Sequence, residues 1–210
     1  TVGASASDPP VFKFIRNNDL PAISEFVQTN DINGMYGADS ITLLIYSIRS
    51  GSNKAVELLL LQGADPNKNM DHKNPLMYAI LEGSRSKINT LLDFHANAND
   101  RDPDGNHSLI YAAIQGNVNI IKILLKHGAY LNLKNNSRLT AYDFAVKSNN
   151  SEAAKYLKLR YEKNLPEFHD GPYISWIDRN TIRALYLHHD SVKNITKKIS
   201  RSFNAESDPF

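Results

Sequence analysis

Residues 102–134 read DPDGNHSLIYAAIQGNVNIIKILLKHGAYLNLK, and this stretch decides the fold because its landmarks recur along the chain. A glycine between successive turns recurs as Gly51, Gly83 and Gly116. The turn segments that follow recur as residues 63–67, 95–99 and 128–132. A period of 32 to 33 residues indicates a repeat architecture, in which each unit buries its apolar side against the next.

The pattern within the period resembles the ankyrin repeat, whose turn has the form DxxGxTPLHxAA. Residues 71–79, 102–113 and 140–145 approximate that turn. The histidine of TPLH is absent, and its place is taken by Ile45, Met77, Ile110 and Asp143. We expect apolar packing to replace the hydrogen bond that this histidine makes. The resemblance covers about three quarters of the chain and implies a mainly α fold: an α-solenoid of helix pairs joined by β-hairpin-like tips.

The repeat pattern divides the chain into a tail, about five repeats and a C-terminal element. Residues 1–8 lack apolar periodicity, and we expect them to be disordered. The repeats are residues 9–36, 37–70, 71–101, 102–134 and 135–163, and the last one is predicted to cap the stack. The register of the second helices predicts one continuous core that contains Val56, Leu59, Leu60, Ile88, Leu91, Leu92, Ile121, Leu124 and Leu125. Leu61, Lys87 and Lys122 are expected on the outer side.

Pro166 ends the helical pattern, and the remaining chain has a different character. Alternating β-branched and aromatic residues predict strands at residues 173–177, 181–188 and 196–203. Residues 164–210 therefore predict a small β meander, either packed on the last repeat or opening a domain that continues further.

Composition restricts the classes of partner. The 210 residues are 41% hydrophobic and 22% charged, and the net charge of +2 does not favour a nucleic-acid partner. No apolar run is long enough for a membrane helix, so we expect no membrane insertion. Without cysteine there are no disulfides, and the compartment stays open: secreted or periplasmic if Thr1 follows a cleaved signal peptide, otherwise cytoplasmic. We expect a monomer.

Three segments contain residue types that occur in metal or phosphate sites. Residues 100–106 begin like a calcium loop, but Tyr111 stands where the bidentate glutamate is needed, so a structural turn is favoured. His188 and Asp190 lack further ligands, and the basic residues Lys193, Lys197, Lys198 and Arg201 have acidic neighbours. No nucleophile elbow or phosphate loop occurs. We therefore predict no metal, no cofactor and no catalytic residues.

A column of aromatic residues is the main candidate site. Successive repeats carry Tyr46, Tyr78, Tyr111 and Phe144 after the TPLH-like segment, and the family resemblance implies that this position faces a concave groove. These rings either pack on one another or form a binding strip at about 10 Å spacing, and the two readings are compatible. The groove edge is predicted at Arg49, Glu82, Gln115 and Lys147, and the hairpin tips at His72, Lys73, Asn106 and Arg138.

The resemblance implies a non-enzymatic module that binds an unknown partner protein in the groove. An alternative is that the chain is the recognition arm of a larger secreted bacterial hydrolase. That alternative depends on residues 166–176, which resemble the segment before the catalytic domain of secreted bacterial metallophosphoesterases. A purely structural spacer is the third reading, and it predicts no preference for the groove.

Overall fold

The computed structural model describes residues 8–162 and shows helices in pairs. The first helices of the five pairs are α1 (Pro10–Arg16), α3 (Leu43–Ser50), α5 (Pro75–Leu81), α7 (Ser108–Ile114) and α9 (Ala141–Lys147). The second helices are α2 (Leu20–Thr29), α4 (Asn53–Leu61), α6 (Arg85–Asp93), α8 (Val118–Lys126) and α10 (Ser151–Glu162). Strands β1 (Met35–Tyr36) and β2 (Ile41–Thr42) form an antiparallel hairpin between the first two pairs.

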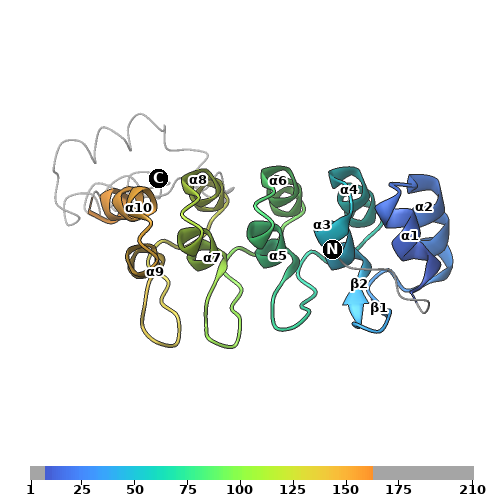
Figure 1. Cartoon of the computed structure of the whole chain (residues 1–210), viewed down its shortest axis with the longest axis horizontal. Coiled ribbons are helices and arrows are strands. Elements are labelled where there is room, and N and C mark those ends of the chain that lie inside the picture. The colour runs from blue at the N-terminus through green and yellow to red at the C-terminus, as the bar shows by residue number, and fades with distance from the viewer. Residues whose placement is uncertain (1–7, 163–210) are drawn as a thin grey trace, which may run out of the picture. The chain divides into compact units, whose positions relative to one another are not determined.

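The pairs stack side by side, which confirms the predicted α-solenoid. First helices pack on first helices, as α3 does on α5 and α5 on α7, and second helices pack on second helices. Figure 1 shows α5, α7 and α9 in one row and α6, α8 and α10 in another, with the tips extending from the row of first helices. The predicted strands of residues 164–210 and the predicted tail, apart from Asp8, lie outside the described residues.

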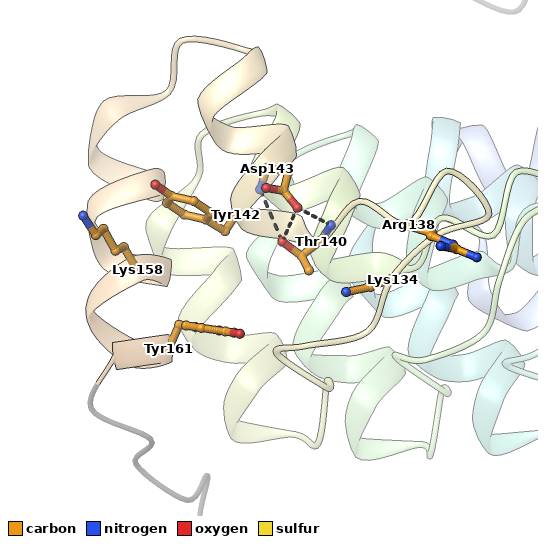
Figure 2. A pocket seen from close by; sticks show the side chains of 7 residues that line it. All are labelled: Lys134, Arg138, Thr140, Tyr142, Asp143, Lys158 and Tyr161. Carbon is orange, nitrogen blue, oxygen red and sulfur yellow. Dashed lines mark hydrogen bonds between the residues drawn. The ribbon is translucent and has the colours of Figure 1, made fainter.

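Three of the five first helices, α3, α5 and α9, begin at a residue whose side chain caps the helix. The side chains of Thr42, Asn74 and Thr140 accept hydrogen bonds from backbone amides three residues later. Thr140 and Asp143 form a complete capping box, because Asp143 also accepts from the Thr140 backbone amide at 2.8 Å (Figure 2). Asp143 therefore has a defined role in the place of the family's histidine.

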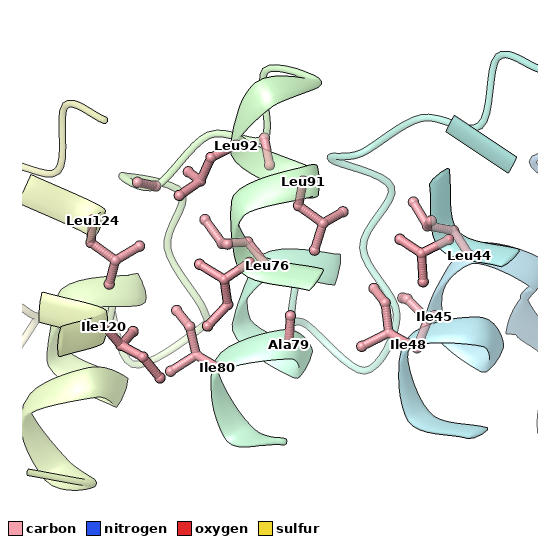
Figure 3. Packing of buried hydrophobic residues seen from close by; sticks show 14 of the residues in the cluster. Leu44, Ile45, Ile48, Leu76, Ala79, Ile80, Leu91, Leu92, Ile120 and Leu124 are labelled. Carbon is pink, nitrogen blue, oxygen red and sulfur yellow. The ribbon is translucent and has the colours of Figure 1, made fainter. Parts of the chain in front are cut away.

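The core runs through the stack without interruption. Side chains from several repeats interdigitate in Figure 3, among them Ile48, Ile80 and Ile120. Ile45, Met77 and Ile110 are buried, so apolar packing does replace the missing histidine in three repeats. Leu92, predicted in the core, is 6% exposed, and Leu61, predicted on the outer side, is 68% exposed.

A row of asparagines joins the tips of successive repeats. Asn33 accepts a hydrogen bond from the Asp65 amide and donates one to the Gly63 carbonyl. Asn67 makes the same pair of bonds with Asn97 and His95, and Asn99 makes it with Tyr130 and Gly128. Each amide side chain therefore satisfies both a donor and an acceptor of the next repeat, which fixes the spacing between repeats.

The C-terminal carbonyls of the first helices are also capped from the next repeat. Lys87 donates to the carbonyl of Ile48, Gln115 to that of Leu81, and Asn150 to those of Ala113 and Ile114. The expectation that Lys87 lies on the solvated back is therefore wrong. The equivalent residues of three other repeats, Ala55, Ile120 and Ala153, are buried. Burial lowers the pKa of the Lys87 ammonium group. A cation at the end of α3 also complements the helix dipole.

Candidate functional site

The side of α5 and α7 that lies next to the tips carries the candidate site. Tyr78, Leu81 and Glu82 follow the Asn74 cap by four, seven and eight residues, and Tyr111, Ile114 and Gln115 follow His107 in the same way. Positions three and four residues apart share one face of a helix. We call these six residues, three on each helix, the inner face.

Two tyrosines of the inner face are tied to the tips. The Tyr111 hydroxyl donates to Oδ2 of Asp102 at 2.6 Å, and the Tyr78 hydroxyl donates to the Met70 carbonyl at 3.2 Å. Both rings are half-buried. Burial raises the pKa of both phenols, and for Tyr111 the bond to Asp102 raises it further. Both hydroxyls therefore stay protonated at neutral pH and hold the helices against the tips.

Tyr46 does not belong to an open groove. It is 2% exposed, its ring stacks on Phe12 with centroids 3.9 Å apart, and its hydroxyl accepts a hydrogen bond from Arg16. The first repeat covers this ring, so the predicted column of four aromatic residues is shortened at its N-terminal end. Phe144, at the other end of the column, is half-buried.

The predicted groove edge mixes two registers. Arg49 and Lys147 follow their N-caps by seven residues, whereas Glu82 and Gln115 follow theirs by eight. The residues that share the register of Arg49 are Leu81 and Ile114, which are 45% and 42% exposed. This apolar pair was not among the predicted site residues. The signal that identifies it is its distance of seven residues from the N-cap.

The tip residues differ in what they can offer a partner. His72 and Arg138 are exposed, and both have positive φ angles, at 62° and 61°. Lys73 is half-buried, and its backbone pairs with Met70. Asn106 is committed to the turn, because its amide group donates to Asp102 and accepts from Asn135.

Asp102 organises the tip of the fourth repeat as a turn. Its carboxylate accepts from the backbone amide and the side chain of Asn106, at 2.8 and 3.0 Å, and from Tyr111. Burial alone would raise the pKa of Asp102, but these hydrogen bonds outweigh it and lower that pKa below its ordinary value. Within residues 8–162, no cluster of three or more His, Cys, Asp or Glu side chains is placed to hold a metal ion. The hydrogen bonds support the turn reading of this segment.

A pocket of about 440 Å³ lies on the last described repeat. Its lining residues are Lys134, Arg138, Thr140, Tyr142, Asp143, Lys158 and Tyr161. They come from the tip before α9, from α9 and from α10 (Figure 2). Of this set, Arg138 is a residue predicted at a partner-binding hairpin tip.

Comparisons with known proteins agree with this architecture. The family model described as ankyrin repeats (3 copies) matches residues 11–102 and 76–166. The chain belongs to the ankyrin repeat family.

Individual relatives are distant in sequence. The putative ankyrin repeat protein FPV031 of Fowlpox virus is 33% identical over 126 residues, 57% of this chain and 37% of that protein. FPV223 of the same virus is 30% identical over 131 residues, 62% of this chain and 92% of that protein. Alpha-latrocrustotoxin-Lt1a of Latrodectus tredecimguttatus is 26% identical over 138 residues, 63% of this chain. The chain spans only 10% of the toxin's length.

These relatives give no support to the metallophosphoesterase resemblance, whose residues 166–176 lie outside the described residues. Among the described helices, none combines the length and the apolar character needed to cross a membrane.

Proposed function

We propose that this chain is a non-enzymatic module that binds a partner protein on the inner face of its third and fourth repeats. Ankyrin repeats are generally protein–protein interaction modules. The observation that carries the proposal is the exposed pair Leu81 and Ile114, at equivalent places on α5 and α7. The two helices pack on one another, and exposed apolar patches are a common feature of interaction sites.

The surroundings of this pair support an interface. Tyr78 and Tyr111 precede the two apolar residues by one helical turn, and their rings are held by bonds to the tips. Glu82 and Gln115 are exposed polar residues beside them. An apolar and aromatic centre with a polar rim is the usual composition of a protein interface. A helical or extended segment that lies across both repeats would contact all six residues.

Rigidity also favours the inner face as a binding surface. Gln115 donates to the Leu81 carbonyl at 3.0 Å, which links the two helices within the face itself. A surface that is already ordered loses less conformational entropy when a partner binds.

Site-specific photo-crosslinking tests the proposal. A photoreactive phenylalanine analogue is placed at Ile114 in one sample and at Leu61 in another, since Leu61 is an exposed apolar residue on a second helix, α4. We expect a partner protein to be crosslinked from position 114 and not from position 61. Crosslinking only from position 61 would contradict the proposal, and no specific crosslinking from either would support the spacer reading.

A further inference from the structure

The two halves of the described chain carry opposite charge. Residues 102–162, the described part of the fourth and fifth repeats, contain eight Lys and Arg and five Asp and Glu, whereas residues 8–101 contain nine Lys and Arg and eleven Asp and Glu. The net charge of +2 for the whole chain conceals this difference. The fourth and fifth repeats therefore present a positive electrostatic potential to a partner.

Two of these cations, Lys134 and Arg138, line the pocket on the last repeat and carry the argument that follows. Among the described lining residues the one carboxylate is Asp143. It is engaged in the cap of α9, where it accepts from the amide and the hydroxyl of Thr140, both at 2.8 Å. The pocket is therefore suited to a ligand that brings its own negative charge.

Two tyrosines give the same pocket an apolar component. Tyr142 is half-buried, and Tyr161 is 61% exposed, which is unusual for so large a ring. In Figure 2 the amino end of Lys134 and the phenol end of Tyr161 point toward one another, while the guanidinium of Arg138 lies apart at the rim. The amino group of Lys134 and the ring of Tyr161 thus face the same space.

We propose that this pocket binds an acidic peptide segment of a partner protein, with its carboxylates at Lys134 and Arg138 and an apolar or aromatic side chain against Tyr142 and Tyr161. The pocket of about 440 Å³ has the size of sites that enclose small ligands or a few side chains. A nucleic acid fits less well, because its phosphate backbone is bound through cations spread along the strand, whereas the cations of this site line one pocket. The pocket is separate from the inner face, so either proposal can be disproved while the other stands.

Fluorescence anisotropy with defined probes tests this site on the full chain. The probe is a labelled peptide of glutamates around one phenylalanine, compared with the same peptide carrying glutamines and with a single-stranded oligonucleotide of equal net charge. The test variant is Lys134→Glu with Arg138→Glu. The control is Lys54→Glu with Lys68→Glu, which makes the same charge change at exposed residues of the second repeat. Circular dichroism melts check that every variant is folded.

We expect the acidic peptide to bind best and the Lys134/Arg138 pair of changes to weaken it about tenfold or more, while the control pair has less than a twofold effect. Tyr161→Ala should weaken binding severalfold. Leu81→Ser with Ile114→Ser should leave it unchanged, because the inner face is not involved. The proposal is disproved if the acidic peptide does not bind, or if the glutamine peptide binds equally well. It is also disproved if the test variant and the control variant lose the same affinity, or if the oligonucleotide binds more tightly than the acidic peptide.

Discussion

Tyr111 on α7 donates a hydrogen bond of 2.6 Å to Asp102, nine residues earlier at the start of the same tip. This bond joins the two parts of the repeat that a partner would meet, the first helix and the tip. Burial and the bond together raise the pKa of the tyrosine, and the bond helps to lower the pKa of the aspartate. The ring is therefore held in one orientation on the inner face.

Tyr111→Phe should destabilise the protein by about 1–2 kcal/mol, because the bond has an ionised acceptor. Tyr78→Phe is the matched control and should cost less, since the Tyr78 hydroxyl donates to a neutral carbonyl at 3.2 Å. Urea unfolding at pH 7 measures both. The lowered pKa of Asp102 means that its contribution is present above about pH 4 and is lost below it. Equal losses for the two variants at pH 7 would show that the carboxylate adds nothing.

Gly105 and Gly83 should respond differently to alanine. Both have positive φ, at 78° and 68°, so each substitution carries a backbone cost of about 1 kcal/mol. A Cβ at Gly105 would also lie 2.8 Å from the Asn136 backbone nitrogen, whereas one at Gly83 meets nothing within 4 Å. We expect Gly105→Ala to cost more than about 2 kcal/mol and Gly83→Ala about 1. Thermal melts that rank the two in the opposite order would contradict the packing of this tip on the next one.

His107 should make stability depend on pH. It is buried, its Nε2 donates to the Leu133 carbonyl at 3.1 Å, and its Nδ1 is buried without a hydrogen-bond partner. Burial lowers the pKa of this histidine, so the folded state binds a proton less readily than the unfolded state. Its contribution is complete above about pH 6.5 and falls, by at most about 1.4 kcal/mol per pH unit, as the pH is lowered.

Denaturant midpoints at pH 7 and pH 5.5 measure that effect. The wild-type midpoint should be lower at pH 5.5 than at pH 7, and His107→Asn should remove most of this decrease. His127→Asn is the control, because His127 is exposed. If both variants keep the wild-type difference, His107 does not control the pH dependence.

Leu92→Ala should cost about 2–5 kcal/mol, the usual range for a buried leucine. Leu61→Ala should change stability by less than about 0.5 kcal/mol, because that side chain is 68% exposed. Calorimetric melts of the two variants provide the comparison. Similar shifts in Tm would contradict the register of the core.

The repeat stack and its core could be predicted from the sequence, because the spacing of apolar residues follows from helix geometry and recurs in several repeats. It was not sufficient for Tyr46, since the stacking of Phe12 on that ring depends on how the first repeat docks. The position of Lys87 was predicted wrongly for a similar reason. A lysine is expected to be solvated unless its hydrogen-bond partner is known, and that partner, the Ile48 carbonyl near the end of α3, belongs to another repeat. Leu81 and Ile114 were not predicted, because the predicted edge residues Glu82 and Gln115 lie one position beyond the register of Arg49 and Lys147.

The most direct test of the proposed function is the affinity of a crosslinked partner for two variants, measured by calorimetry. Leu81→Ser with Ile114→Ser removes the apolar pair from the inner face, and Leu61→Ser makes the same chemical change on α4. The account predicts that the first variant loses at least about tenfold in affinity with little change in Tm, and that the second binds like the wild type. Wild-type affinity in the first variant together with lost binding in the second would contradict it.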